Sequence, residues 1–201
     1  MSKILVIKTS MIQEEKSIST ALVNRFIKYY KKKNQLDEIN TLDLNTVEMA
    51  NITMNQENFN DKSFFNSEHS ARYIEQLKNV NKIVFVSPMT NFNITALAKN
   101  YLDHILVADK TFSYKYAKEG ASIGLLPHLK VQILTTQGAP FGWYQWGNHT
   151  KYLEGTWNFV GARIAKSINI CGTKLHENSN LMPEQLIDKY DLEIKLAAEK
   201  F

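Results

Sequence analysis

The sequence predicts an α/β protein built on a five-stranded parallel sheet with helices on both faces. Two observations predict this class. Short runs rich in β-branched residues alternate along the chain with longer amphipathic runs, five of each, which is typical of repeated strand–helix units. The runs at residues 3–8 and 82–87 are apolar without alternation, as in strands buried on both faces. Right-handed crossovers leave few possible topologies. In such sheets ligands bind beyond the carboxyl ends of the strands, at the switch point.

The first third of the chain gives two strands, one helix and a segment with weak signals. Residues 3–8 form the first strand, and a polar loop follows. Residues 19–33 have apolar side chains at helical spacing. These are Leu22, Val23, Phe26, Ile27 and Tyr30. Residues 39–44 alternate apolar and polar and predict a strand nearer an edge, whereas the Asn-rich residues 45–66 predict an excursion from the pattern.

The remaining chain continues the alternation. Pro88 ends the third strand because proline cannot donate to a ladder, Gly172 breaks the fifth, and Pro183 suits the first turn of the last helix. A loop rich in glycine and aromatic residues occupies 136–147. The expected elements, in order, are a helix at 68–79, a strand at 82–87, a helix at 94–107, a strand at 131–135, a helix at 152–166, a strand at 168–171 and a helix at 183–199.

The composition favours one globular domain spanning residues 1–201, with 44% hydrophobic and 22% charged residues. No apolar run reaches the length of a membrane span, and the first is too short for a signal-peptide core. Cys171 is the only cysteine, so no internal disulfide can form, which agrees with a reducing compartment. We therefore expect a cytoplasmic protein with no membrane association.

The formal charge of +4 and the pI of about 9.0 suggest an anionic partner. The densest basic run, residues 28–33, falls at the end of the first predicted helix, where the helix dipole favours cations. We favour a solvated helix end over a nucleic-acid site, and we expect no nucleic-acid partner.

Hydroxyl side chains gather in the loop after the first strand. Ser10, Ser17 and Ser19 lie there beside the expected start of a helix, whose free amides and dipole favour an anion. Capping by Ser17 or Ser19 explains the serines equally well. The dinucleotide fingerprint and the lysine-bearing P-loop are both absent from the sequence. A loop that holds phosphate with hydroxyls rather than glycines suits a mononucleotide flavin.

The loops after the third and fourth strands offer backbone groups rather than acids and bases. In residues 87–94 a run of amides can meet a flat polar ring edge-on, and Phe92 can supply an apolar wall. A proline turn and a helix cap explain Pro88 and Asn93 without a ligand. After the fourth strand Gly138 allows close approach of the backbone, although a plain turn accounts for that stretch alone.

Aromatic residues follow Gly138 in a cluster. Its members are Phe141, Trp143, Tyr144, Trp146, Tyr152, Trp157 and Phe159. Some fill the core, but Trp143 and Trp146 fall in a glycine-flanked loop that suits a lid or a partner contact. The five histidines show no metal-ligand spacing, and His149 reads as a surface residue near the site. We identify neither a metal ligand nor an essential acid, base or nucleophile.

At this level of detail the chain resembles the FMN-dependent NADH-azoreductases, bacterial flavodoxin-like homodimers once named acyl-carrier-protein phosphodiesterases. The likeness extends over nearly the whole length and is most specific from Met89 to Asp103. It is carried by the opening Met-Ser-Lys-Ile-Leu-Val-Ile-Lys-Thr-Ser, by Ser17-x-Ser19, by Pro88-Met89-x-Asn91-Phe92-Asn93-Ile94, by Leu97-x-Lys99-Asn100-Tyr101-Leu102-Asp103, by Thr111-Phe112-x-Tyr114 and by Gly138.

The resemblance implies three groups of FMN-binding residues. The phosphate loop falls on Ser10, Ser17, Ile18 and Ser19, the segment at the edge of the isoalloxazine ring on Met89, Thr90, Asn91 and Phe92, and a second ring contact on Thr136, Gln137, Gly138 and Ala139. The family usually has tyrosine in place of Thr90 and Ser-Arg-Gly-Gly in place of residues 136–139. Both departures bear on the choice of substrate and on nicotinamide affinity.

The resemblance further implies a homodimer with non-covalent FMN that takes electrons from NADH and reduces a quinone or an azo compound in a second stage. The cofactor supplies that chemistry, and the protein supplies position and electrostatics. One alternative is a flavodoxin-type electron carrier that docks proteins, but such carriers are expected to be acidic and to lack an aromatic lid. A phosphodiesterase, as the old name says, would need a metal cluster or an activated nucleophile. The sequence does not separate NADH from NADPH.

Overall fold

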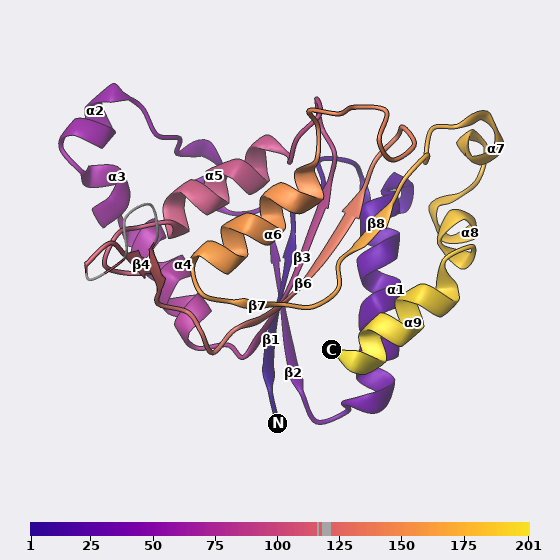
Figure 1. The fold of residues 1–201 in the computed structure, drawn as a ribbon, viewed down its shortest axis with the longest axis horizontal. Coiled ribbons are helices and arrows are strands. Elements are labelled where there is room, and N and C mark those ends of the chain that lie inside the picture. The colour runs from indigo at the N-terminus through magenta and orange to yellow at the C-terminus, as the bar shows by residue number, and fades with distance from the viewer. Residues whose placement is uncertain (116, 118–121) are drawn as a thin grey trace.

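The computed structural model describes residues 1–115, 117 and 122–201. Its centre is a parallel sheet in the order β2-β1-β3-β6, with two further short strands, β7 and β8, along the outer side of β6 (Figure 1). The strands are β1 (Lys3–Lys8), β2 (Glu38–Asp43), β3 (Lys82–Pro88), β6 (Lys130–Thr136), β7 (Arg163–Ile164) and β8 (Ile168–Ile170). The predicted parallel sheet is therefore confirmed.

The sheet has six strands rather than five because its last strand is divided. β7 pairs with Lys130 and Val131, and β8 pairs further along β6. The helix predicted to reach residue 166 ends earlier, as α6 (His149–Phe159). Gly161 stops it, since its φ of 93° belongs to the left-handed region that glycine adopts after a helix end. The residues after Gly161 then return to the sheet edge as β7.

Helices cover both faces of the sheet (Figure 1). In β1, Leu5 and Ile7 pack into one apolar cluster and Ile4 and Val6 into another, so successive side chains serve opposite faces. The first cluster lies under α4 (Glu68–Lys78), α5 (Ala96–Ile105) and α6, and the second under α1 (Ile18–Lys33), α8 (Pro183–Asp188) and α9 (Asp191–Lys200). Burial on both faces explains why β1 and β3 show no polar alternation.

The predicted last helix is broken into α8 and α9 at Lys189 and Tyr190. Both pieces are held on α1 by Arg25. Its guanidinium lies 2.9 Å from Glu184, 2.8 Å from Asp188 and 2.5 Å from Asp191. This cation serves carboxylates from two helices, so the break does not release α9 from the sheet.

Short elements occupy the segments that had weak sequence signals. They are η1 (Glu14–Lys16), η2 (Glu48–Asn51), α2 (Gln56–Asn60), α3 (Ser63–Asn66), α7 (His176–Ser179) and an antiparallel pair, β4 (Phe112–Ser113) with β5 (Ile123–Gly124). His104 anchors the excursion at 45–66: its Nδ1 lies 2.9 Å from the Ser70 hydroxyl, its Nε2 lies 3.0 Å from the Ile52 carbonyl, and its ring stacks on Phe64.

None of the helices in the described part of the chain combines the length and the apolar character needed to cross a membrane.

Candidate functional site

The three loops singled out in the sequence come together at one edge of the sheet. β1 pairs with β3 and β3 with β6, all in parallel, so the loops that follow them are neighbours. A backbone hydrogen bond of 2.7 Å from the Met89 amide to the Thr136 carbonyl joins the second loop, after β3, to the third loop, after β6. The site predicted from the strand order is therefore one continuous region at the carboxyl ends of β1, β3 and β6.

The loop after β1 ends in a buried cluster of hydroxyl groups at the start of α1. Ser10 and Ser17 Oγ atoms lie 2.9 Å apart, and Ser17 and Ser19 Oγ atoms 3.2 Å apart. The three serines are between 1% and 7% exposed. Buried hydroxyls are retained where something accepts or donates to them, and each can rotate its O–H toward an anion. The amides of Ile18 and Ser19 fall in the first turn of α1, where no intrahelical partner exists.

Capping and anion binding are compatible at this helix start. Ser17 is the N-cap, since its hydroxyl accepts from the Thr20 amide at 3.2 Å. Ser19 lies inside the helix and does not cap it. The Asn45 side chain donates to the Ser10 carbonyl at 2.7 Å and fixes the loop from outside. A cavity of about 240 Å³ opens beside the cluster, lined by Lys8, Ser10, Met11, Ile12, Gln13, Glu14, Thr20, Asp43 and Asn45.

The loop after β3 turns sharply at Asn91 and Phe92. Their φ angles are 47° and 71°, in the left-handed region that asparagine tolerates but phenylalanine rarely occupies. The turn is closed by Thr90 and Asn93, each of whose amides donates to the other's carbonyl, at 2.8 and 3.1 Å. Backbone strain that is retained at a loop tip points to a function for that tip.

The loop after β6 is braced from within by one of its own side chains. The Gln137 side-chain amide donates to the carbonyls of Ala139 and Pro140, both at 3.0 Å, and Gln137 is 5% exposed. Gln137 therefore braces the loop from the position at which the resembled family usually carries arginine.

A segment that the sequence did not indicate completes this loop. The amides of Gly172, Thr173 and Lys174 donate to the carbonyls of residues 139, 137 and 138 respectively, at 2.8, 3.1 and 3.0 Å. A Cβ on Gly138 would lie 2.9 Å from the Lys174 side chain. The only sequence signal for this segment was Gly172, which reads as a strand end and does not disclose what its neighbours contact.

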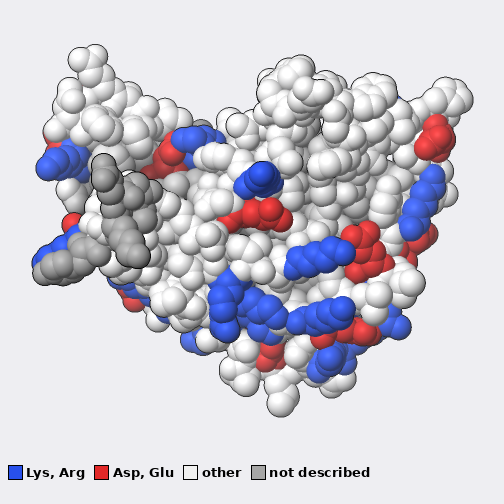
Figure 2. All heavy atoms as spheres, in the orientation of Figure 1, with Lys and Arg blue, Asp and Glu red and all other residues white. Residues whose placement is uncertain are grey.

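Aromatic side chains rise from the third loop and meet the second. The Phe92 ring lies 4.7 Å from Tyr144 and 5.7 Å from Trp146, between centroids. Phe141, Trp143 and Trp146 remain 69%, 65% and 74% exposed. Figure 2 shows the charged side chains of this face mostly over its lower half, while the upper edge, where Figure 1 draws this loop, is largely uncharged.

The other predicted aromatic positions divide between core and surface. Trp157 is fully buried against Phe85, as expected for a core residue. Phe159 is 37% exposed and packs on Phe112 with centroids 4.9 Å apart.

The expectation that His149 lies on the surface is wrong. It is the first residue of α6 and only 1% exposed, beside the end of β6, where the hydroxyls of Thr135 and Thr150 lie 2.7 Å apart. Burial lowers the pKa of His149 to about 4, and the Thr136 backbone opposes that shift only in part. Within the described residues neither ring nitrogen of His149 has a hydrogen-bond partner that meets ordinary distance and angle limits.

Comparisons with known proteins place the chain in a family. A family model described as a flavodoxin-like fold matches residues 2–193. The FMN-dependent NADH:quinone oxidoreductase of Malacoplasma penetrans is 57% identical over 201 residues, covering 100% of this chain and 94% of that protein. The protein of the same name from Mycoplasmopsis pulmonis is 56% identical and both chains are covered completely, at 100%.

Solved structures share the fold at lower identity. An azoreductase from Bacillus anthracis strain Sterne superposes with a TM-score of 0.84 at 23% identity, covering 100% of both chains. An FMN-dependent NADH-azoreductase from Bacillus anthracis strain Ames Ancestor, in complex with FMN, gives a TM-score of 0.77 at 23% identity, covering 100% of this chain and 99% of that one. With the family model and the relatives above half identity, these findings show that the chain belongs to the flavodoxin-like family that includes the FMN-dependent NADH:quinone oxidoreductases.

Proposed function

We propose that the protein is an FMN-dependent oxidoreductase that passes electrons from NADH to quinones. The observation that carries the proposal is the buried hydroxyl cluster at the start of α1, next to two loops on the adjoining strands that carry exposed aromatic side chains. Relatives that are more than half identical over the whole of this chain bear that name, which supports the same activity here.

The phosphate of FMN fits the loop after β1. Ser10, Ser17 and Ser19 each offer a rotatable donor, and the first-turn amides of Ile18 and Ser19 offer fixed ones. Hydrogen bonds to a charged acceptor are stronger than those between hydroxyls, and the dipole of α1 favours the anion further. Lys8, at the end of β1, lines the neighbouring cavity and adds a cation there. Its Nζ lies 3.5 Å from Oε1 of Glu14, which lines the same cavity.

We place the isoalloxazine ring against the second and third loops, which the hydrogen bond from the Met89 amide to the Thr136 carbonyl joins directly. Met89, Thr90, Asn91 and Phe92 would line one side, and Thr136, Gln137, Gly138 and Ala139 the other. The carbonyls of residues 136–139 are occupied by backbone donors from Met89 and from residues 172–174. The ring's polar edge would therefore meet amides of these loops other than those of Met89, Thr90 and Gln137, which already donate to backbone carbonyls. The side chains of Thr90 and Gln137 would not be needed to hold it.

When bound, FMN supplies the redox chemistry by accepting a hydride from NADH and returning two electrons to the acceptor, which takes up protons to form a hydroquinone. The protein's part is to hold the ring with one face open and to let donor and acceptor use that face in turn. Quinones and azo compounds are both flat and both accept two electrons, so the space over the open face of the flavin, here called the substrate slot, suits either.

We further propose that the working unit is a homodimer with the substrate slot shared between chains. Phe141, Trp143 and Trp146 are more than 60% exposed and stand beside the candidate ring site. Aromatic residues are enriched at protein interfaces, and a two-fold contact would cover this uncharged edge on both chains. The second chain would then form one wall of the slot.

Initial rates with FMN-loaded protein, NADH and a water-soluble benzoquinone test the proposal. We expect turnover that depends on added or retained FMN, and parallel double-reciprocal plots, because NAD⁺ leaves before the quinone enters. FMN-free protein is the control. Intersecting plots would contradict the use of one flavin face by donor and acceptor in turn, and absence of turnover in flavin-loaded protein would contradict the activity.

A further inference from the structure

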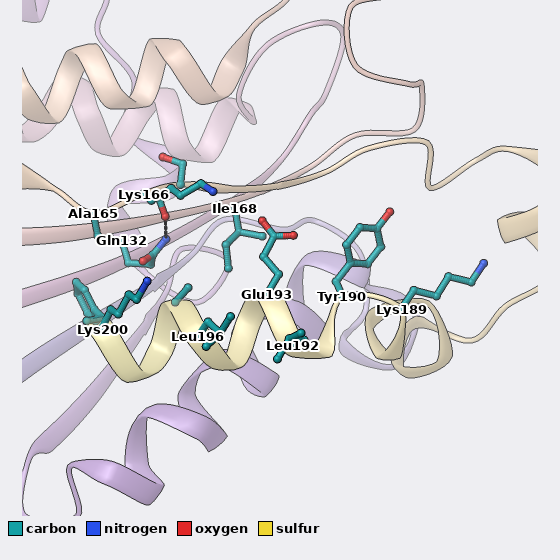
Figure 3. Close-up of a pocket in the computed structure, with 13 residues that line it drawn as sticks. Gln132, Ala165, Lys166, Ile168, Lys189, Tyr190, Leu192, Glu193, Leu196 and Lys200 are labelled. Atoms are coloured by element: carbon teal, nitrogen blue, oxygen red, sulfur yellow. Dashed lines mark hydrogen bonds between the residues drawn. The ribbon is translucent and has the colours of Figure 1, made fainter.

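Beyond this redox function, we propose that a groove between α9 and the divided edge strand is a binding site for a long-chain carboxylate. The groove encloses about 560 Å³, within the range of small-molecule pockets. Figure 3 shows α9 along one side and the segment from Ala165 to Ile168 along the other. None of its lining residues belongs to the three loops of the cofactor site.

The division of the last strand produces the groove. After β7 the Ala165 amide still donates to Val131 at 2.8 Å, but Lys166 and Ser167 leave the sheet before β8 begins. The buried Gln132 side chain donates to the Lys166 carbonyl at 2.9 Å, and the Ser167 hydroxyl donates to Glu154 at 2.6 Å. The departure from the sheet is thus fixed by hydrogen bonds, and the hollow between it and α9 is part of the fold.

The surface of the groove is predominantly apolar. Ile168 and Phe201 are 2% and 6% exposed and form its base, whereas Leu192 and Leu196 on α9 are 69% and 46% exposed. Leucines presented to solvent beside a concave apolar surface suit the flexible methylene chain of a ligand. Covering them would remove apolar area from water, which favours binding.

The charged groups along the groove select an anion. Lys166, Lys189 and Lys200 line it, against a single acid, Glu193. Lys189 donates to Asn178 at 2.7 Å, and within the described residues Lys166 and Lys200 form no ion pair. A chain with one carboxylate matches both features, since its methylenes cover the apolar base and its head meets a lysine. A cationic amphiphile of equal length would be repelled.

Methyl NMR of the FMN-loaded protein with dodecanoate tests the proposal. We expect saturable shifts at Ile168, Leu192 and Leu196. Ala165→Trp, which fills the groove, should abolish them. Leu196→Glu, a change at a half-exposed position that leaves the core intact, should weaken binding at least about tenfold by placing a negative charge in the path of the chain.

The charge requirement is tested separately. Lys166→Gln with Lys200→Gln should weaken dodecanoate binding at least about tenfold, whereas the matched pair Lys62→Gln with Lys78→Gln, outside the groove, should not. Three results would each overturn the proposal: no saturable shift, equal affinity for dodecyltrimethylammonium, or shifts confined to Met89 and the cofactor loops. Dimerisation that Leu196→Glu abolishes would also overturn it, by assigning the groove to a second copy. The cofactor proposal stands or falls independently, on flavin content.

Discussion

The rings of Phe92 and Tyr144 meet edge to face, with centroids 4.7 Å apart and an interplanar angle of 76°. This contact joins the tip of the loop after β3 to the aromatic loop after β6. Phe92 makes it from a backbone with φ of 71°, a conformation that costs an L-residue roughly 1–2 kcal/mol. The strained turn thus presents an aromatic ring at the rim of the candidate site.

The strain can be measured by comparing two substitutions at one position. Phe92→Ala and Phe92→Gly both remove the ring, but only glycine is relaxed at this φ. We expect Phe92→Gly to be more stable than Phe92→Ala by about 1 kcal/mol in urea unfolding. Equal stability, or the reverse order, would show that the turn relaxes once the ring is gone.

The hydroxyl cluster can be separated from its capping role. The double variant Ser17→Ala with Ser19→Ala should bind FMN at least about tenfold more weakly, because hydrogen bonds to a charged group are each worth about 1.5–3 kcal/mol. Ser67 is the matched control, since it caps α4 through a 3.1 Å bond to the Ser70 amide. Ser67→Ala should lose about 1 kcal/mol of stability and leave flavin affinity unchanged. Unchanged flavin affinity in the double variant would leave the serines as caps alone.

Sequence patterns predicted the sheet because strands buried on both faces must be apolar at nearly every position, and such runs are visible in the sequence. They failed where a single residue decides the outcome. Gly161 makes α6 end at Phe159. The two strands that follow, β7 and β8, have two and three residues, which is too short for any periodicity to show in the sequence. The break between α8 and α9 is likewise unmarked by proline or glycine, since Lys189 and Tyr190 occupy it.

Buried His149 makes stability depend on pH. Its pKa is about 4 in the folded protein and about 6.5 when unfolded, so between these values only the unfolded chain binds the proton. Stability should therefore be fully present above about pH 6.5 and fall as the pH drops toward 4, by about 3 kcal/mol at about 1.4 kcal/mol per pKa unit.

His149→Leu should flatten the stability profile between these pH values, whatever it does to the absolute stability. His176→Leu, at an exposed position, should leave the slope as it is in the parent protein. Urea unfolding across this pH range checks both variants. A profile that stays steep in His149→Leu would assign the pH dependence to other groups, with His104, whose pKa is also lowered by burial, the first to examine.

Two glycines should respond to alanine with opposite signs. A Cβ on Gly124 would lie 2.1 Å from the Gly161 backbone nitrogen, a clash that only a backbone shift relieves. Gly155 is exposed in the middle of α6 with nothing within 4 Å of a new Cβ. Gly124→Ala should destabilise by more than about 2 kcal/mol, and Gly155→Ala should stabilise by about 0.5–1 kcal/mol. Thermal unfolding measures both, and a stable Gly124→Ala would contradict the close contact between these backbones.

The candidate site was predictable where it follows from topology and unpredictable where it depends on distant chain segments. Ser10 and Met89 follow strands and Thr136 ends one, so their convergence comes from strand order alone. The bracing of residues 137–139 by residues 172–174 joins segments separated by more than thirty positions, and no local pattern encodes it. His149 was misread because a polar residue in a loop-rich stretch gives no sign of burial on its own.

An anaerobic titration of the purified, FMN-loaded protein tests the central claim most directly. Reduction by NADH and reoxidation by a quinone are each followed through the visible absorption of the bound flavin, without relying on turnover. NADH alone should bleach the flavin band with about one equivalent per chain, and a benzoquinone added afterwards should restore it. A protein that takes up no FMN, or one whose flavin band is unmoved by NADH, would contradict the account.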